Sequence, residues 1–479
     1  MAKLTKLDDI VSLCKRRGFI YQSSEIYGGL AACYDYGPLG SELKRNVRNA
    51  WWKAVVQMRD DVVGLDCAIL MHPMVWKASG HADKFADVVT VCKKCNTRTR
   101  VDHLPDSGKP PVENEFGLGG KVCPACGAIG QFGKPMAFRL MFETQMGANA
   151  DDTMTLFLRP ETAQGIFANF RNVLDSSRVK IPFGIGQIGK SFRNEVTTKA
   201  FIFRTREFEQ AELEFFCKPG TDEEWYNHWK QQRFQWYLDL GIKKENLRFR
   251  EHEKDELAHY AKACVDIEYK FPFGSGDWQE LEGIANRTDF DLRQHQRGMR
   301  TMTDWFEKKG DLTQIKLRDE DPDYIKGPLA YFEEETRDRF VPYVIEPSAG
   351  VDRSTLAFLV DAYDEDEVNG EVRNVLRFHP HLAPIKAAIF PLVKKDGLPE
   401  IATKLYDDLK KYFNCFYDEK GAVGRRYRRQ DEAGTPYCMT IDGQTKEDGT
   451  VTVRERDSML QTRVALDQVK TFLRDKLDM

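Results

Sequence analysis

Apolar side chains recur at helical spacing in several parts of the chain. In residues 41–59, leucine, valine and tryptophan return every four positions, and basic residues occupy the opposite face. A stripe of this kind predicts a long amphipathic helix. Residues 222–240 and 253–264 have a similar pattern and are also predicted to be helical.

Strand patterns lie between and after these helices. Aromatic and β-branched residues alternate through 181–217, which predicts strand, loop and strand. Residues 361–381 are acidic and then interrupted by prolines, which indicates a linker. Beyond it the patterns predict a small α/β domain. Its expected elements are strands at 386–393, 415–418, 437–442 and 450–455, a helix at 398–413, a basic turn before the third strand, and a closing helix from about Ser458.

Composition narrows the class of protein. The 479 residues include 71 Lys and Arg against 75 Asp and Glu, a net charge of −4, and 41% are apolar. These values exclude a disordered or fibrous protein and suggest about two to four domains. No apolar run approaches the ~20 residues of a membrane-spanning helix, and the first residues lack a signal-peptide core. We therefore predict a cytoplasmic protein with no membrane segment.

The eleven cysteines include two close pairs, Cys92 with Cys95 and Cys123 with Cys126, inside a proline- and glycine-containing stretch that interrupts the apolar pattern. Four thiolates suit tetrahedral zinc, although residues 96–122 between the pairs exceed the usual spacing of about 15–20. We predict a structural zinc site in an inserted module. A redox pair is the alternative, but the surrounding sequence does not resemble a thioredoxin unit.

A phosphate-loop pattern occurs at residues 184–191, GIGQIGKS, which match both GxxxxGK[ST] and GxGxxG. Both patterns require a strand, a glycine turn and then a helix N-terminus aimed at phosphates. The residues that follow show aromatic alternation without a helical apolar stripe. We therefore interpret this stretch as a core strand and set aside a P-loop nucleotidase that uses Lys190.

Read as strand, loop and strand, the same region places Arg193 and Glu195 opposite the run FRTREFEQAE at 203–212. This arrangement resembles motif 2 of class II aminoacyl-tRNA synthetases. The segment EPSAGVDR at 346–353, followed by an apolar helix, is similar to motif 3, whose arginine faces ATP. The amphipathic helix that ends near GLDCAILMHP at 64–73 resembles motif 1, the dimer-forming element.

The resemblance narrows to glycyl-tRNA synthetases of the homodimeric type and covers essentially the whole chain. It rests on several long motifs in the expected order. These are SEIYGGL at 24–30, DYGPLG at 35–40, LRPETAQ at 158–164, ELEGIANR at 280–287, EPSAG at 346–350 and, in the anticodon-binding region, GRRYRRQDEAGTPYC at 424–438.

The resemblance implies an α+β fold, with a class II antiparallel sheet flanked by helices, a zinc-ribbon-like insertion and a C-terminal α/β anticodon-binding domain. The expected division is catalytic core at 1–86 and 140–375, insertion at 87–139 and anticodon-binding domain at 376–479. The implied activity is ligation of glycine to tRNA-Gly by a homodimer, with ATP and magnesium.

Aminoacyl adenylate formation requires an enzyme that positions two anions and stabilises charge on the transferring phosphorus. The family's pattern assigns catalysis to Arg193, Glu195 and Arg353 and stacking on adenine to Phe208. The wider ATP set is Arg193, Asn194, Glu195, Phe203, Arg204, Arg206, Phe208, Glu280, Leu281 and Arg353. Glu280 is also a candidate magnesium ligand, with a simple salt bridge as the alternative.

Glycine offers only an ammonium and a carboxylate, so its selection requires carboxylates and a pocket without room for a side chain. By resemblance, the glycine-binding residues are Arg100, Glu161, Phe208, Gln210, Glu212, Glu346, Ser348 and Gly350. Glu161 alone would also fit a helix N-terminal carboxylate after Pro160. An editing domain is not required.

The densest basic cluster is Arg425, Arg426, Arg428 and Arg429, with Tyr427 inside it. Arginine planes and aromatic rings suit a single-stranded anticodon loop, and Arg425, Arg426 and Arg429 are the candidate tRNA contacts. A solvated helix face is the alternative. A different class of function also remains, a non-catalytic nucleic-acid-binding relative of the polymerase accessory subunit type. That protein would not need Arg193, Glu195 and Arg353.

Overall fold

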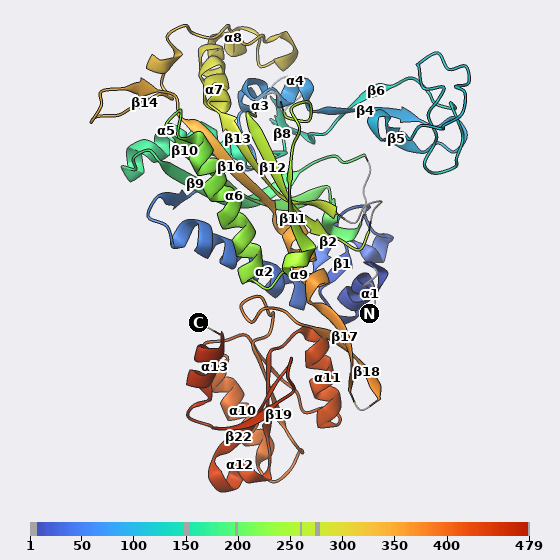
Figure 1. The fold of residues 1–479 in the computed structure, drawn as a ribbon, viewed down its shortest axis with the longest axis vertical. Coiled ribbons are helices and arrows are strands. Elements are labelled where there is room, and N and C mark those ends of the chain that lie inside the picture. Colours follow the sequence, from blue (N-terminus) through green and yellow to red (C-terminus); the bar gives the residue numbers. More distant parts are fainter. Residues whose placement is uncertain are drawn as a thin grey trace.

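A seven-stranded sheet forms the centre of the molecule (Figure 1). The computed structural model describes residues 7–147, 154–196, 200–258, 261–273, 278–368 and 370–477. All neighbouring strands are antiparallel except β3 and β9, which are parallel. In spatial order the strands are β11 (Leu247–Glu251), β12 (Ala263–Lys270), β13 (Trp278–Thr288), β16 (Tyr343–Gly350), β10 (Glu207–Cys217), β9 (Phe183–Phe192) and β3 (Val62–Gly64).

Alternation along β10 assigns the two faces of the sheet, because successive side chains of a strand point to opposite sides. Leu213 and Phe215 pack into the main core with helices α2 (Pro38–Trp52), α6 (Asp222–Asp239) and α9 (Val351–Ala362). Phe216 points the other way, into a second core with α5 (Ala163–Ser177) and α7 (Phe290–Arg300). The polar residues of β10 that share this second face are therefore directed away from the main core.

A buried ionic cluster joins three segments that are far apart in the sequence. Nζ of Lys44, on α2, lies 2.8 Å from Oδ1 of Asp352 on α9 and 2.9 Å from Oε2 of Glu209 on β10. Oδ2 of Asp352 accepts a hydrogen bond of 2.7 Å from the Glu209 backbone N–H, and the Tyr36 hydroxyl donates to Oδ1 at 2.5 Å. Although burial raises the pKa of Asp352, Lys44 and Tyr36 bring it below its usual value.

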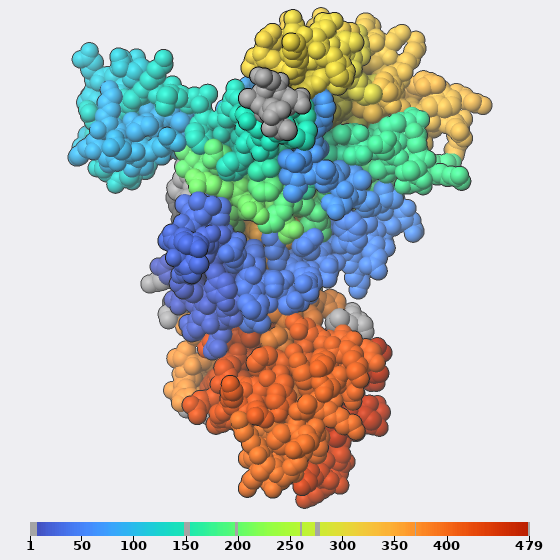
Figure 2. Space-filling view, turned by 180° about the vertical axis from the view of Figure 1, so that it is seen from behind, coloured from blue at the N-terminus to red at the C-terminus, as the bar shows by residue number. Residues whose placement is uncertain are grey.

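The inserted module projects from one side of the body (Figures 1 and 2). Its three-stranded sheet has the order β5 (Arg98–Arg100), β4 (Ala86–Val91) and β6 (Met136–Arg139). The buried core of the module is small, with Cys92, Leu104, Leu118, Cys123 and Phe132 as its members. A core of this size gives little stability without a metal or another cross-link.

The C-terminal region forms a separate lobe, coloured orange to red in Figures 1 and 2. Its five-stranded sheet has the order β20 (Cys415–Tyr417), β19 (Ala387–Pro391), β21 (Tyr437–Ile441), β22 (Thr450–Glu455) and β23 (Gln461–Ala465). The helices are α10 (Leu398–Leu409), α11 (Val423–Ala433), α12 (Gly443–Asp448) and α13 (Val469–Leu477). The strands expected at 386–393, 415–418, 437–442 and 450–455, and the helix at 398–413, are confirmed.

Several sequence predictions are wrong in detail. The segment predicted as a basic turn forms helix α11. The prediction missed this helix because the segment has too few apolar positions to show a helical stripe. The predicted linker contains a hairpin, β17 (Tyr363–Val368) with β18 (Glu371–Leu376), whose acidic residues pair with arginines. The closing helix begins only at Val469, after strand β23.

The helix expected at 253–264 is also wrong, because the described residues there form turns followed by strand β12. Residues 259–260 of that segment lie outside the described residues. The helix at 41–59 and the strand, loop and strand at 181–217 are confirmed as α2, β9 and β10, with 197–199 of the loop also outside the described residues. The last turns of the first helix are π-helical, at Lys53–Gln57.

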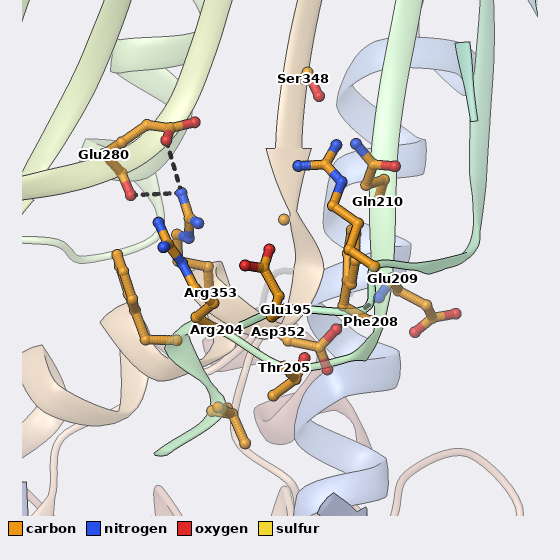
Figure 3. A pocket seen from close by; sticks show the side chains of 14 residues that line it. Glu195, Arg204, Thr205, Phe208, Glu209, Gln210, Glu280, Ser348, Asp352 and Arg353 are labelled. Atoms are coloured by element: carbon orange, nitrogen blue, oxygen red, sulfur yellow. Dashed lines mark hydrogen bonds and ion pairs between the residues drawn. The ribbon is translucent and has the colours of Figure 1, made fainter. Parts of the chain in front are cut away.

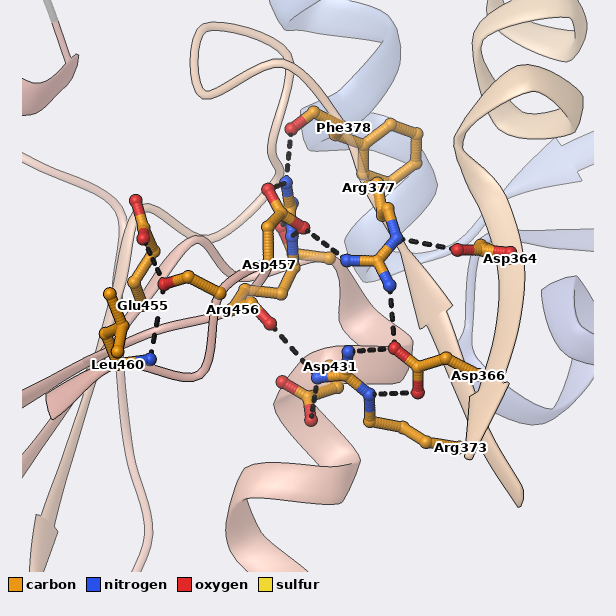
Figure 4. A network of polar contacts seen from close by, with 12 residues as sticks. Asp364, Asp366, Arg373, Arg377, Phe378, Asp431, Glu455, Arg456, Asp457 and Leu460 are labelled. Atoms are coloured by element: carbon orange, nitrogen blue, oxygen red, sulfur yellow. Dashed lines mark hydrogen bonds and ion pairs between the residues drawn. The ribbon is translucent and has the colours of Figure 1, made fainter. Parts of the chain in front are cut away.

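Arginine–carboxylate pairs connect the hairpin to the C-terminal lobe (Figure 4). Arg373 of β18 pairs with Asp366 of β17 and, at 3.3 Å, with Asp431 of α11. Arg377 reaches Asp366 at 2.7 Å and Asp457 of the lobe at 3.1 Å. Because α9 runs directly into β17, the same segment of chain reaches from the sheet to this contact.

Substituting Lys44 with methionine should strongly destabilise the protein, because it would leave Glu209 and Asp352 as buried carboxylates without their ammonium. We expect a loss of about 3–5 kcal/mol in the free energy of unfolding, measured by chemical denaturation. Arg45→Met is the matched control on the same helix, since its side chain is 64% exposed. Equal effects of the two substitutions would contradict the role assigned to Lys44.

Candidate active site

A cavity of about 210 Å³ opens on the sheet where β9, β10, β13 and β16 meet (Figure 3). Its wall combines residues of the segment 193–210, which resembles motif 2, with residues of the segment 348–353, which resembles motif 3. Predicted residues in its wall are Arg193, Glu195, Phe203, Arg204, Phe208, Gln210, Glu280, Ser348, Gly350 and Arg353, and the wall also includes Ile202, Thr205, Glu209 and Asp352.

Arg353 points into this cavity from the first turn of α9 (Figure 3). Its Nη1 lies 3.1 Å from Oε2 of Glu280 and donates a hydrogen bond of 3.0 Å to the Glu280 carbonyl. The guanidinium also lies 4.4 Å from the ring centroid of Phe203. The Arg353 charge is the largest factor that lowers the pKa of Glu280. One side of the cavity therefore has a cation held by an aromatic ring and a carboxylate.

Arg193 stands at the end of β9, beside the start of β10. Its Nε donates a hydrogen bond of 3.0 Å to the carbonyl of Pro160. Its guanidinium carbon lies 5.4 Å from the ring centroid of Phe208, which the antiparallel register places opposite Ser191. The cavity thus lies between two arginines that come from different parts of the chain, with an aromatic ring beside each.

Deeper in the site, Glu212 of β10 collects several donors. Its Oε1 accepts hydrogen bonds from the Ser348 hydroxyl at 2.7 Å and from Nε2 of Gln210 at 2.8 Å. Its Oε2 accepts from the backbone N–H and the hydroxyl of Thr162. Burial and the nearby Glu161 raise the pKa of Glu212 despite these donors. The Glu212–Ser348 hydrogen bond therefore fixes two of the predicted glycine-binding side chains relative to each other.

Glu346 and Glu161 are held by separate partners. Glu346 Oε2 lies 2.6 Å from Nη1 of Arg287, while burial raises the pKa of Glu346 to about 8. Glu161 accepts from Nε2 of Gln164 at 2.9 Å and lies 3.4 Å from Nε2 of His81. Although burial raises the pKa of Glu161, His81 and Arg287 bring it well below its usual range.

Carboxylates outnumber cations in this inner region. Arg287 also pairs with Asp291 through two bonds of 2.7 and 2.9 Å, so one guanidinium serves two carboxylates. Burial lowers the pKa of His295, which packs here, to about 4 and keeps its ring neutral. The inner region therefore favours a small cation.

Sequence reasoning missed several residues of this region. They are His81, Thr162, Gln164, Glu214, Arg287, Asp291 and His295. Arg287 was detectable, because it ends the motif at 280–287. Thr162 and Gln164 were also detectable, because they lie in the motif at 158–164, whereas the others come from three separate segments whose proximity depends on the folded sheet.

Some residues that were predicted to bind ATP or glycine do not line the cavity. The Leu281 side chain is fully buried in the main core, on the face of the sheet that packs against α2, α6 and α9. The Arg206 guanidinium donates to the carbonyls of Ala31 and Glu195 at the rim. Asn194 donates its backbone N–H to Leu140. Arg100 lies on β5 of the insertion, paired with Asp87 at 3.2 Å and Asp102 at 2.6 Å.

The four predicted zinc ligands converge. Sγ of Cys92 lies 3.7 Å from Sγ of Cys126, and Sγ of Cys95 lies 3.6 Å from Sγ of Cys123. All four sulfurs lie within 4.8 Å of one another. Tetrahedral zinc with bonds of about 2.3 Å separates its sulfurs by about 3.8 Å. The cluster therefore has the dimensions of a zinc site.

A second group of potential ligands, His252, Cys264 and Asp266, lines a neighbouring cavity. Here Nε2 of His252 lies 2.8 Å from Oδ2 of Asp266, and the Arg250 guanidinium is 3.8 Å from the same oxygen. An arginine at this distance opposes a cation, so hydrogen bonding accounts for the cluster.

The predicted tRNA contacts lie on α11, and they differ in exposure. Arg426 is 3% exposed and donates to the carbonyls of Pro391, at 2.5 Å, and Gly421, so its guanidinium holds backbone inside the lobe. A surface role for Arg426 is therefore wrong. Arg429 pairs with Asp418, and Arg425 is exposed.

Comparison with known proteins gives the class first. Residues 142–363 match the model described as tRNA synthetase class II core domain (G, H, P, S and T), and residues 386–476 match the anticodon binding domain. The antiparallel sheet and the C-terminal lobe are thus those of a class II synthetase, as the sequence predicted.

Curated relatives narrow this class. The chain is 54% identical to Glycine–tRNA ligase of Thermobifida fusca, with 99% of each chain covered. It is 52% identical to Glycine–tRNA ligase of Caldanaerobacter subterraneus, with 98% of each covered, and 50% identical to that of Treponema denticola, with 98% and 97% covered. The chain belongs to the glycine–tRNA ligase family. Among the described helices, none has the length and apolar character needed to cross a membrane.

Glu346 should make stability depend on pH. Its pKa of about 8 in the folded protein exceeds the usual value of 4.5 for a glutamate side chain, so the folded state holds a proton that the unfolded state has lost between these values. Its contribution is complete below about pH 4.5 and disappears as pH rises through about 8, by at most about 1.4 kcal/mol per pH unit.

The measurement is the difference in unfolding free energy between the wild type and Glu346→Gln, taken from pH 5 to pH 8. We expect this difference to fall as pH rises. Glu335→Gln, at a side chain 84% exposed, is the control. A constant difference at position 346 would contradict the raised pKa.

Proposed function

We propose that this chain ligates glycine to tRNA-Gly in two steps at the cavity of Figure 3. A glycine carboxylate oxygen attacks the α-phosphorus of ATP, and pyrophosphate leaves. The terminal ribose hydroxyl of tRNA then attacks the acyl carbon, and AMP leaves. The observation that carries this proposal is that a cavity with Arg193 and Arg353 in its wall adjoins a group of buried glutamates. Gln210 and Ser348 of the wall are hydrogen-bonded to Glu212, and Ser348 also lines the neighbouring cavity with Glu346.

The outer region suits ATP. Arg193 would contact the α-phosphate and the glycine carboxylate, and Arg353 the distal phosphates, with Arg204 assisting. Both arginines already lie beside aromatic rings, and Phe208 would stack on adenine. Charges held in place before reaction stabilise the pentacovalent phosphorus without reorganisation. Glu195 lines the same wall and is proposed to orient the nucleotide.

The inner region suits glycine. The ammonium would lie among Glu161, Glu212 and Glu346, and the Ser348 hydroxyl and Gln210 would close the pocket. The hydrogen bonds that tie Ser348 and Gln210 to Glu212 leave these groups little freedom to retreat from a larger amino acid. Such a pocket excludes side chains sterically. Gly350 adds no side chain to the wall.

Arg100 is proposed to face the substrate carboxylate from the insertion. Its charge is near enough to Glu195 for that carboxylate to contribute to the raised pKa of Arg100, after Asp102 and Asp87. The module would therefore have to keep its position relative to the catalytic sheet.

Class II synthetases use ATP with magnesium. Glu280 is the proposed magnesium ligand, since it borders the cavity, and its ion pair with Arg353 at 3.1 Å would have to open for it to bind the metal. Magnesium would neutralise phosphate charge. The four cysteines are proposed to hold a structural zinc that braces the insertion, in agreement with their sulfur spacing.

Further proposals concern assembly, tRNA contacts, the compartment and the domain division. Helix α2 and the segment after it are proposed to form a homodimer interface, and Arg425 and Arg429 to contact the anticodon loop. The proposed compartment is the cytoplasm. The proposed domains are a catalytic core at 1–86 and 140–375, an insertion at 87–139 and an anticodon-binding domain at 376–479. A non-catalytic binding relative is disfavoured, because Arg193, Glu195 and Arg353 meet in one cavity.

The experiment that tests the proposed activity is amino-acid-dependent exchange of labelled pyrophosphate into ATP, with glycine, alanine and serine compared and no tRNA added. We expect exchange with glycine alone. Arg353→Ala should reduce the rate by about 10²–10³, the loss typical of one group that stabilises transition-state charge.

Lys190→Ala is the matched control. Lys190 belongs to the rejected phosphate-loop pattern, lies on β9 and pairs with Glu207 at 2.5 Å. Its removal should leave exchange nearly unchanged. Loss of exchange in Lys190→Ala with little effect of Arg353→Ala would overturn the assignment. Absence of exchange in the folded wild type would favour the binding relative.

Removal of a zinc ligand should affect the insertion selectively. We expect one zinc per chain in the wild type and none in Cys123→Ser, by elemental analysis. Without the metal, the buried side chains that remain to hold the module are Leu104, Leu118 and Phe132, so amide exchange in 92–126 should accelerate while the central sheet stays protected. Cys33→Ser, outside the cluster, should retain zinc. Full zinc content in Cys123→Ser would contradict the site.

A further inference from the structure

Two glutamates face each other across neighbouring strands beneath the glycine pocket. The register of β10 and β16 pairs Glu212 with Ser348 and Phe215 with Ile345, which places Glu214 opposite Glu346. Both side chains share the face of the sheet that carries Glu212 and Ser348. Like charges at opposite positions on one face of a sheet destabilise it. The presence of two glutamates at these positions therefore needs a physical explanation.

Glu214 has no counterion of its own. Its side chain is fully buried, and neither carboxylate oxygen accepts a hydrogen bond from any donor among the described residues. Arg287, whose charge counteracts part of the rise in the pKa of Glu214, pairs with Asp291 and Glu346. Glu212, on the same strand, is the other charged group that acts on Glu214. Glu161, Asp291 and His295 belong to the same inner region through their contacts with Glu346, Arg287 and Gln164.

Glu282 shows how a buried glutamate of this sheet is normally supplied with partners. It is equally buried, on the opposite face of β13, yet it accepts hydrogen bonds from Arg233 at 2.7 and 3.2 Å and from the Tyr237 hydroxyl at 2.9 Å. Glu214 has none of these compensations. An isolated buried carboxylate takes up a proton instead. Burial and the Glu346 charge accordingly raise the pKa of Glu214 well above its usual value.

We propose that Glu214 is a permanently neutral carboxylic acid whose O–H donates a hydrogen bond to Glu346 and orients that carboxylate toward the glycine ammonium. Glu214 is thus a positioning residue. Arg287 holds one oxygen of Glu346, and Glu214 holds the carboxylate from the opposite strand. The proton stays on Glu214 when glycine binds, whereas Glu346, whose pKa of about 8 keeps it largely protonated at neutral pH in the empty site, releases its proton and meets the ammonium charge together with Glu161.

This arrangement explains how a site rich in carboxylates avoids a large excess of negative charge before substrate arrives. A neutral partner fixes the orientation of Glu346 and adds no repulsion. Glutamine could replace Glu214, since its amide also donates a hydrogen bond, whereas an apolar residue of similar size could not. The inference about glycine rests on the proposed function, but the protonation state of Glu214 does not.

The first experiment measures protonation directly. The infrared difference spectrum of the wild type minus Glu214→Gln should contain the C=O stretch of a neutral carboxylic acid from pH 5 to pH 9, with or without glycine. A carboxylate band at pH 7 in its place would overturn the proposal. This result does not depend on whether the protein activates glycine.

The second experiment compares the same substitution at two buried glutamates. Glu282→Gln should lower the melting temperature, because it weakens bonds to a buried guanidinium, while Glu214→Gln should leave it unchanged or raise it. A large loss of stability in Glu214→Gln alone would show that its negative charge is required and would contradict the proposal.

The third experiment separates positioning from charge in the exchange reaction. Glu214→Gln should keep KM for glycine within about threefold of the wild type, and Glu214→Leu should raise it by about tenfold or more, with KM for ATP unchanged. An increase in Glu214→Gln as large as in Glu346→Gln would make Glu214 a charged glycine ligand. If Glu214→Leu does not fold, the infrared and melting comparisons still decide. Absence of exchange in the wild type would refute the proposed function alone.

Discussion

The buried ammonium of Lys44 is the constraint on which the rest of the structure depends. It joins α2, β10 and α9 through Glu209 and Asp352, and these three elements carry the three class II motifs. Because a charge this deep needs its partners within hydrogen-bond distance, the segments cannot shift independently. Arg353, next to Asp352, and Phe208, next to Glu209, therefore keep fixed positions on opposite sides of one cavity.

The active site is organised as a gradient of charge across a single sheet. Its outer part uses arginines supported by aromatic rings, and its inner part uses glutamates supported by hydroxyl, amide and guanidinium donors. Neutral partners are as important as charged ones there. Buried His295 is uncharged, and Glu214 is proposed to be uncharged, so that the pocket presents a limited negative charge to a small ammonium.

The two appended parts use different means of attachment. The insertion has a small apolar core with four converging thiols, and it projects on a narrow connection (Figure 2). The C-terminal lobe has a full core of its own and meets the hairpin β17–β18 through paired arginines and aspartates (Figure 4). Since α9 continues into β17, the position of the lobe and that of Arg353 depend on the same stretch of backbone.

Elements with strong local signals could be predicted from the order of residues alone. The stripe of α2, the alternation of β9 and β10, the CxxC pairs and the motif around Arg353 each depend on neighbours in the chain. Prediction failed where local signals are weak, as at α11, whose polar face hid the helix, and at 253–264. Only the tertiary structure decided that Arg426 is buried, that Leu281 faces the core, and that Glu214, Arg287 and Asp291 join Glu346. These facts depend on strand register and on long-range desolvation, and local residue patterns carry neither.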